Sequence, residues 1–500
     1  PTRNPTQLEN AKTGTSAWVI PTLNHALARE IEGYASATSI NRGESINFHV
    51  STVDPTFTIS VYRMGWYNGA GARLMHTSPT LTGAKQAACA RDTVTNLVEC
   101  AWPSAYTLTV PATPTDPANT AYWSSGYYLA KLSGSGGKES YSIFVLRDDS
   151  RVSDFLFQSS VTTYATYNQW SDVKDANGNF INISSYTTPQ ALKVSFNRPY
   201  HYVYPSNGRI RKGAGDFPEW EHAMVRFIER EGYDVAYNTN IDTHANGTQL
   251  LNHKAFLSVG HDEYWSKEMR DNVEAARNAG VNLAFLGANN AYWQIRLEPA
   301  STAAGAAPHR TIVAYRDKWA QDPEYLANPA SQLVTKKWRD LPTPRPEAAL
   351  IGVQYIYNTL DLDMTISDCT SVLCNGTVSP TNAALRLQPG DTLFKMLGYE
   401  VDAVVPGVTP ANIQIIAASP FTCTNPAFPF CDGVTPQYSH MTTYTAASGA
   451  KVFATGSMNW NFGVDNISPY ANGRVNANVQ TITRNVFNSF TPVPPQLSTS

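Results

Sequence analysis

The stretch AFLSVGHDEYWSKEMRDNVEAARNAGVNLAFLG (255–287) places an amphipathic segment between two short apolar runs. The runs AFLSVG (255–260) and VNLAFLG (281–287) indicate strands that are buried on both faces, as in a parallel sheet. Between them, SKEMRDNVEAARNAG (266–280) predicts a helix that ends at Gly280. A strand, a helix and a strand in this order are typical of a doubly wound α/β domain.

The same pattern continues on both sides of this stretch. Further strands and helices are expected at DFLFQSS (154–160), LKVSF (192–196), EWEHAMVRFIEREG (219–232), KVFATGSMNW (451–460) and NVQTITRNVFNSF (478–490). Between about 298 and 440 the chain is rich in proline and contains cysteines, which indicates a long insertion. We therefore predict a doubly wound, glutamine-amidotransferase-like α/β domain over 149–492 whose sheet is interrupted in the sequence.

A different pattern occupies residues 31–148. Short alternating runs, separated by Pro and Gly clusters, occur at SINFHVS (45–51), FTISVYRM (57–64), YTLTVP (106–111), GYYLAKL (126–132) and ESYSIFVLR (139–147). Almost no helical period accompanies them, so we predict an Ig-like antiparallel β-sandwich. Residues 1–30 would then be an N-terminal arm and 493–500 a tail.

The composition excludes several classes of protein. The 500 residues (54.8 kDa) are 42% hydrophobic and 15% charged, which is typical of a globular chain with two or three domains. A net charge of −3 gives no surface for nucleic acid or an anionic membrane. No apolar stretch approaches the roughly 18 residues of a spanning helix, and the chain starts at Pro1 without an apolar signal core. We expect a processed, soluble chain.

The six cysteines form three couples that are close in sequence: Cys89 with Cys100, Cys369 with Cys374, and Cys423 with Cys431. Other pairings are open, but an even number without a CxxC motif favours disulfides over a metal cluster and indicates a secreted, extracellular protein. Four glycosylation-type sequons begin at Asn182, Asn246, Asn375 and Asn466. They fit a glycoprotein, with chance occurrence in a chain rich in Asn, Ser and Thr as the alternative.

Polar side chains follow several of the expected strands at the point where each strand ends. In open α/β sheets the ligand site lies beyond the carboxyl ends of the strands. The segments in question are 162–168 after DFLFQSS, 197–200 after KVSF, 261–265 after AFLSVG and 288–290 after VNLAFLG. On one loop, His261 offers an imidazole for proton transfer and Glu263 a carboxylate that can bind a metal.

Each of these residues also has a structural interpretation. The acidic residues near His261 suit the first turn of the helix that follows. Tyr164, Tyr167 and Tyr200 are candidates for plain aromatic packing in a chain with 26 tyrosines. Asn289 can satisfy backbone groups of its loop.

The sequence lacks the motifs of several other classes of enzyme. There is no GxSxG elbow, HExxH helix or Walker loop, and no GxGxxG after the first strand of the α/β unit. SGSGGKES (133–140) is expected to be a hairpin turn between two sandwich strands. If all six cysteines are paired, no cysteine nucleophile remains for amidotransferase chemistry.

Many motifs in one order resemble the N,N-dimethylformamidase large (beta) subunit-like family. The motifs are IEGYASATSINRGESINFHVS, YRMGWYNGAGARL, SSVTTYATYNQW, KVSFNRPY, FIEREGYDVAYNTNIDTH, FLSVGHDEYWSKEMRDNVEAARNAGVNLAFLGAN, LGYEVD and GAKVFATGSMNWNFGVD. The resemblance runs from about residue 30 to 490. It implies an amide hydrolase with one mononuclear Fe(III), held by two tyrosine phenolates and a glutamate, whose hard anionic oxygens suit that ion.

Carried over by motif, the resemblance assigns a role to individual residues. The iron ligands would be Glu263 of GHDEYW, Tyr200 of NRPY and Tyr167 of ATYN, with Tyr164 as the alternative to Tyr167. The catalytic groups would be His261 as the nearby base or orienter, with Asn289 of GAN and Glu400 of LGYEVD as pocket groups. Arg316 or Lys318 of AYRDKW would supply a cationic group.

The resemblance leaves two functions to weigh. The first is a secreted, iron-dependent hydrolase of a small linear amide, in which the metal polarises the carbonyl and activates water while Glu400 or His261 takes the proton. The second is an extracellular structural or binding protein that keeps the scaffold and associates with itself as a homo-oligomer or polymer. Both functions leave open whether the chain has a small partner subunit. After NQW the chain reads SDVKDANGNFINISS instead of the family's short Gly-Gly turn, so the pocket wall beside Tyr167 differs.

Overall fold

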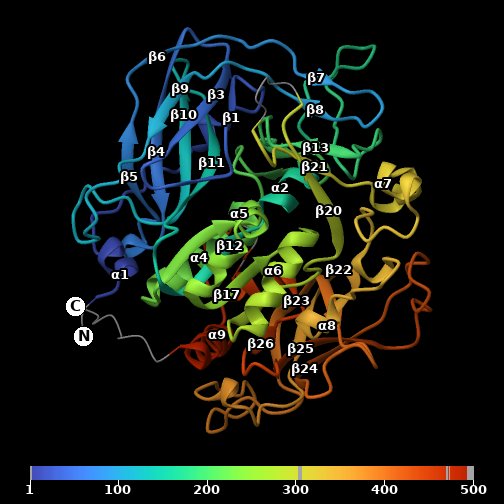
Figure 1. Cartoon of the computed structure of the whole chain (residues 1–500). Helices are drawn as coiled ribbons and strands as arrows, with labels where there is room; N and C mark the ends of the chain where they lie inside the picture. Colours follow the sequence, from blue (N-terminus) through green and yellow to red (C-terminus); the bar gives the residue numbers. More distant parts are fainter. Residues whose placement is uncertain (1–2, 302–306, 469–470, 472, 492–500) are drawn as a thin grey trace.

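The computed structural model describes residues 3–301, 307–468, 471 and 473–491 of the chain. A β-rich N-terminal module lies against a larger module in which helices and strands alternate (Figure 1). The predicted tail at 493–500 lies outside the described residues.

Two β-sheets pack face to face in the N-terminal module. Their strand orders are β1-β3-β9 and β2-β11-β10-β4-β5, with β6 beside β4. The strands are β1 (Ile31–Ala35), β2 (Ser39–Asn41), β3 (Ser45–Thr52), β4 (Thr56–Met64), β5 (Ala72–Thr77), β6 (Leu81–Thr82), β9 (Tyr106–Thr109), β10 (Gly126–Gly134) and β11 (Glu139–Arg147). Phe48, Val61 and Phe144 belong to one buried core between the sheets. The packed sheets, antiparallel apart from the β2–β11 pair, agree with the alternating runs, whereas the Ig-like assignment stays a prediction.

A seven-stranded sheet forms the centre of the second module, in the order β16-β12-β17-β19-β26-β25-β24. Its strands are β12 (Ser153–Ser159), β16 (Val235–Thr239), β17 (His253–Gly260), β19 (Asn282–Gly287), β24 (Gln414–Phe421), β25 (Gln437–Thr445) and β26 (Lys451–Ala454). The first five in this order pair in parallel, and β25 and β24 add an antiparallel edge. Numbered along the chain, the parallel strands follow the order 2-1-3-4-5 of a doubly wound sheet.

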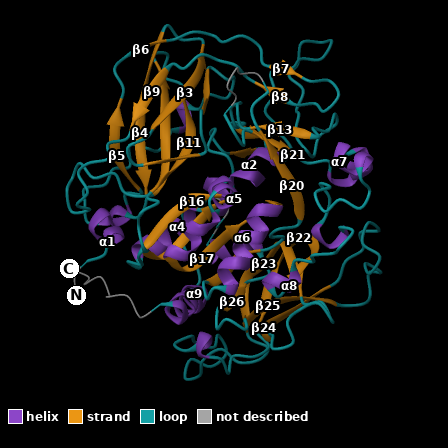
Figure 2. Ribbon diagram, viewed as in Figure 1, coloured by secondary structure: helices purple, strands orange, loops and turns teal. Residues whose placement is uncertain are grey.

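Helices cover both faces of this sheet (Figure 2). The α-helices among the described residues are α1 (Pro5–Asn10), α2 (Val161–Tyr167), α3 (Phe217–Trp220), α4 (His222–Arg230), α5 (Asn240–Ala245), α6 (Lys267–Asn278), α7 (Pro323–Ala327), α8 (Ala348–Ile351) and α9 (Ala477–Phe490). Phe227 of α4 and Ile482 of α9 share one core with Leu257 of β17. Val273 of α6 shares a second core with Phe256, which points to the opposite face because side chains alternate along a strand.

The segment predicted as an insertion is partly built into the sheet. Within it, β22 (Gln354–Thr365) and β23 (Thr392–Ala403) form a long two-stranded ribbon, and β24 joins the central sheet. The strand predicted at LKVSF is also placed differently, because β13 (Lys193–Ser195) lies outside the parallel sheet. It belongs to a separate sheet of order β13-β21-β20-β18, with β18 (Tyr264–Ser266), β20 (Trp293–Glu298) and β21 (Thr311–Val313).

The three predicted cysteine couples are disulfides: Cys89–Cys100, Cys369–Cys374 and Cys423–Cys431. The first encloses the short pair β7 (Ala90–Arg91) and β8 (Val98–Glu99). Two further short strands, β14 (Val203–Tyr204) and β15 (Arg209–Ile210), form a hairpin. Among the described residues, no helix is both long and apolar enough to cross a membrane.

Candidate active site at the carboxyl edge of the sheet

The candidate site lies where the strand order of the sheet reverses. Strand β12 has β16 on one side and β17 on the other. Helix α2 follows β12 and ends at Tyr167, while Glu263 follows β17. Doubly wound sheets bind their ligands at such a switch point, beyond the carboxyl ends of the strands. The two residues meet there, because the Tyr167 hydroxyl donates to Glu263 Oε2 over 2.7 Å.

The loop that carries Glu263 is held tightly by its neighbours. Gly260 has a φ of +74°, and a Cβ there would lie 2.6 Å from the Cβ of Trp220, so the turn requires glycine. The buried carboxylate of Asp262 then accepts from Gln158, Asn240 and Ser258 over 2.8–2.9 Å. Asp262 therefore fixes the loop.

The alternative interpretation of this loop, as the first turn of a helix, is wrong. Helix α6 begins at Lys267, and Ser266 is its N-cap, accepting from the Met269 N–H. This cap is the last residue of β18, which begins directly after Glu263. The carboxylate of Glu263 therefore does not cap this helix.

A second phenol reaches Glu263, and it belongs to Tyr186. The Tyr186 hydroxyl lies 3.0 Å from Oε1 and 3.2 Å from Oε2 of Glu263. Its ring stacks on that of Tyr167, with centroids 4.2 Å apart. Two phenol oxygens and one carboxylate therefore converge on one point.

Tyr200, predicted as the second phenol, lies in another cavity. It packs edge-on against Tyr164, with ring centroids 6.2 Å apart, and lines the space between the two modules with Arg198 and Arg310. The prediction placed Tyr200 at a strand end of the central sheet. Strand β13, which precedes it, belongs to the separate sheet and therefore does not direct Tyr200 to the switch point.

Tyr164, the alternative ligand, is also engaged elsewhere. Its hydroxyl donates to the buried carboxylate of Glu221, which also accepts from the hydroxyl of Tyr127. Burial raises the pKa of Glu221 to about 7, although these donors act in the opposite direction. Tyr164 thus belongs to a polar cluster between the sandwich and the α/β module.

His261 joins Glu263 to Glu400. Its Nε2 lies 3.2 Å from Glu263 Oε2 and 3.2 Å from Glu400 Oε2. Burial lowers the pKa of His261, but the two carboxylates, Glu400 foremost, outweigh it and raise the pKa to about 10. The structure therefore brings His261, predicted as the base or orienter, into contact with both acids.

Of the two candidate cations, Arg316 is in the site. Its guanidinium lies 3.7 Å from the centre of the Tyr186 ring, and its Nη1 donates to the Ser185 carbonyl. The hydroxyl of Tyr264 extends the cluster, 2.5 Å from that of Tyr186. Arg316 thus fixes Tyr186 from the side opposite Tyr167 and adds positive charge beside Glu263.

Asn289 follows strand β19, which is the neighbour of β17 in the sheet. Its backbone has a φ of +57°, and its N–H donates to Asp402 Oδ1 over 2.9 Å. Asp402 is two residues from Glu400 on β23. The side-chain Oδ1 of Asn289 is buried and has no hydrogen-bond partner among the described residues.

Comparison with known families decides where the chain belongs. The family described as "N,N-dimethylformamidase beta subunit-like, C-terminal" matches residues 58–474, which include every residue of the candidate site. The chain is a member of this family. No curated protein matches this dimethylformamidase-like chain.

Two solved structures match parts of the dimethylformamidase-like chain. The alkylpurine DNA glycosylase AlkC of Pseudomonas fluorescens, bound to DNA, is 15% identical over 24% of this chain and 30% of its own, with a TM-score of 0.15. A cycloisomaltooligosaccharide glucanotransferase of Paenibacillus sp. is 10% identical over 51% of this chain and 44% of its own, with a TM-score of 0.17. Likenesses this low support no assignment.

The donor set of the dimethylformamidase-like chain fits the ferric ion that the family resemblance implies. Tyr167, Tyr186 and Glu263 offer three hard oxygen donors that can be anionic. Beside them, the buried atoms His261 Nε2 and Glu400 Oε2 lie 3.2 Å apart and form an ion pair when His261 is protonated. No group of three His, Cys, Asp or Glu side chains in the described part of the chain could hold a metal, so a metal here would depend on the phenols.

Proposed function

We propose that this chain hydrolyses the C–N bond of small linear amides with one ferric ion held by Tyr167, Tyr186 and Glu263. The observation that supports it is the convergence of both phenols on Glu263 at the switch point of the sheet, in a member of the dimethylformamidase-like family. Tyr186 takes the place for which Tyr200 was predicted.

When bound, the ion supplies Lewis acidity that polarises an amide carbonyl and makes water more acidic. The remaining steps belong to side chains of the protein. Glu400 can take a proton from the attacking water, and the protonated His261, 3.2 Å away, can deliver one to the leaving amine and recover it from Glu400. The side-chain amide (Nδ2) of Asn289 can donate to the developing oxyanion, an interaction worth about 3 kcal/mol when well aligned.

Enclosure of the site favours a small substrate. Glu263, His261 and Glu400 are each no more than 7% exposed, whereas Tyr186 is 38% exposed. Access therefore runs past the Tyr186 ring. The surrounding rings of Tyr167 and Tyr264 would exclude water from the amide, which strengthens each electrostatic contact.

Secretion is part of the same proposal. Three disulfides are consistent with an oxidising compartment. The family name refers to a beta subunit, so a second, small subunit is a candidate partner.

The test is an amide-hydrolysis screen of the purified chain. Small formamides, larger amides and peptide-like amides are incubated with the iron-loaded protein, with and without a chelator, and the released amine is measured. We expect turnover of a subset of the small amides that the chelator abolishes. Absence of turnover from iron-loaded protein, together with ordered polymers of the chain, would favour the extracellular structural or binding protein instead.

A further inference from the structure

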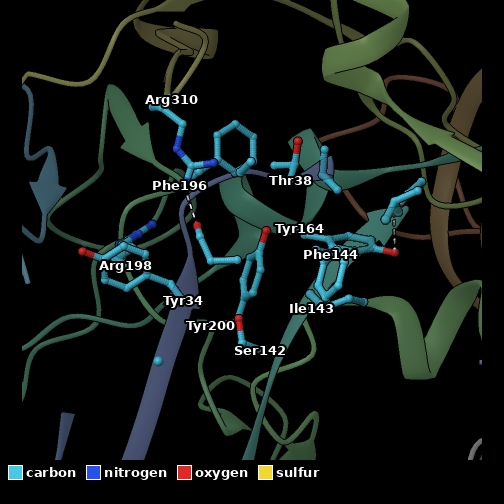
Figure 3. Close-up of a pocket in the computed structure, with 16 residues that line it drawn as sticks. Tyr34, Thr38, Ser142, Ile143, Phe144, Tyr164, Phe196, Arg198, Tyr200 and Arg310 are labelled. Carbon is cyan, nitrogen blue, oxygen red and sulfur yellow. Dashed lines mark hydrogen bonds between the residues drawn. The ribbon is translucent and has the colours of Figure 1, made fainter. Parts of the chain in front are cut away.

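A second cavity lies between the β-sandwich and the α/β module. Tyr34 and Ser142 line it from the sandwich, and Tyr164, Arg198, Tyr200 and Arg310 line it from the other module (Figure 3). Its free volume is about 30 Å³, enough for one or two particles of the size of water. None of the residues that line it belongs to the cluster around Glu263.

Two buried guanidinium groups border this cavity without a carboxylate partner. Arg198 is 2% exposed and Arg310 is 4% exposed. Neither makes an ion pair with any described residue, whereas the buried Arg63 in the same protein pairs with Glu229. A buried charge without a counterion is costly, so two of them at one cavity call for compensation.

Backbone carbonyls satisfy most, but not all, of the donors of Arg198. Its Nη1 donates to Trp170 and Ile183, and its Nη2 donates to Asn168 and, over 3.5 Å, to Ala165. Its Nε is buried and has no hydrogen-bond partner among the described residues. One strong donor therefore remains available.

Arg310 also lacks direct compensation. Its Nε donates to Asn197 Oδ1 and its Nη2 to the carbonyl of Ala35, both over 2.9 Å. The nearby carboxylate of Glu99 accepts a hydrogen bond from the side chain of Asn197 and does not contact Arg310 directly. It also accepts from Ser195 and Ser301. The direct hydrogen-bond partners of Arg310 are therefore neutral.

The phenol of Tyr200 does not supply the missing negative charge. Burial raises its pKa, and this outweighs the effect of Arg310 and Arg198, so the phenol stays protonated at neutral pH. Burial lowers the pKa of both arginines to about 10, which leaves both charged under the same conditions. The cavity thus combines two positive charges with neutral donors.

We propose that this cavity binds one small monovalent anion, for which chloride has the fitting charge and size. The anion would lie among the guanidinium groups of Arg198 and Arg310 and the Tyr200 hydroxyl, and it would join the two modules. The small volume favours a monatomic anion over sulfate or an organic anion.

The anion would also stabilise the backbone segments that carry the two phenols of the candidate active site. The carbonyls that Arg198 holds belong to segments on both sides of the two phenols: Ala165 and Asn168 flank Tyr167, and Ile183 precedes Tyr186. Compensation of the Arg198 charge therefore supports the segments that present both phenols. This inference does not depend on iron, and the cavity would bind its anion in the metal-free protein.

Bromide is the direct probe because it substitutes for chloride and scatters anomalously. Crystals of the whole chain grown in sodium bromide should show an anomalous peak beside Arg198 and Arg310. Bromide found at surface positions alone, with this cavity free of it, would overturn the proposal.

Thermal unfolding provides a second test in solution. At constant ionic strength, replacing gluconate by chloride should raise the Tm of the metal-free protein in a saturable manner. Arg310→Met should lose this dependence, while Lys85→Met, which removes an exposed cation, should keep it. If Arg310→Met does not fold, Arg310→Lys serves instead, because a point charge without the planar fork should weaken the chloride response. An unchanged response in the Arg310 variant would contradict the proposal.

Discussion

Nε2 of His261 lies 3.2 Å from Oε2 of Glu400, although the two residues come from different parts of the fold. His261 follows β17 of the central sheet, and Glu400 lies on β23 of the two-stranded ribbon. The ribbon therefore supplies an acidic residue to a site whose other residues follow strands of the central sheet. This ribbon lies in the segment that was predicted to be an insertion. The proposed function uses this pair for proton transfer.

Replacement of Glu400 separates proton transfer from metal binding. Glu400→Gln keeps the size of the side chain but removes its basicity, so kcat/KM should fall by about 10²–10⁴-fold. Iron content should stay at the wild-type level, because Glu400 is outside the proposed ligand set. The measurements are amide turnover and iron per chain, and loss of iron in this variant would assign Glu400 to the metal instead.

The Glu221 cluster predicts a pH dependence of stability. The folded protein raises the pKa of Glu221 from its ordinary 4.5 to about 7, mainly by burial. A raised pKa contributes stability that is fully present below pH 4.5 and is lost as the pH rises through 7. The difference corresponds to about 3 kcal/mol.

Glu221→Gln should remove this dependence, because glutamine resembles the protonated acid at every pH. We expect the variant to gain stability relative to wild type between pH 5 and pH 8, measured as the difference in Tm by calorimetry. The comparison isolates Glu221 from other groups that titrate over the range. A constant difference between the two proteins would show that Glu221 is ionised in the fold throughout.

All four sequon asparagines are exposed: Asn182, Asn246, Asn375 and Asn466. If the chain passes through a secretory pathway that attaches N-glycans, these positions are accessible in the folded protein. Mass spectrometry of material secreted by a eukaryotic host, before and after enzymatic deglycosylation, should detect glycans on these residues. Secreted protein with four unmodified asparagines would support the interpretation of the sequons as chance.

Much of the fold could be predicted from the sequence because its signals are local. The runs at 255–260 and 281–287 became β17 and β19, with α6 between them, since apolar strands and an amphipathic helix leave clear patterns. The ribbon of β22 and β23 left no such pattern, because several of its residues are exposed and the register shifts within it.

The site was predictable where its residues lie directly after a strand of the central sheet. Glu263 and His261 follow β17, and Tyr167 closes the helix after β12, so motif and topology agreed. Tyr186 lies in an irregular loop without periodicity, directly after the segment 171–185 that departs from the family pattern. Tyr200 lies in a motif of the family and was therefore predicted as a ligand. The pairing of β13 with β21 shows that the strand before Tyr200 belongs to another sheet.

The central claim is that Tyr186, and not Tyr200, binds the ferric ion with Tyr167 and Glu263. Wild-type protein made in iron-replete medium should hold about one iron per chain and show a tyrosinate-to-iron absorption band in the visible range. Tyr186→Phe should lose the iron and the colour, whereas Tyr200→Phe should keep both. Iron and colour retained in Tyr186→Phe, or lost in Tyr200→Phe alone, would contradict the account.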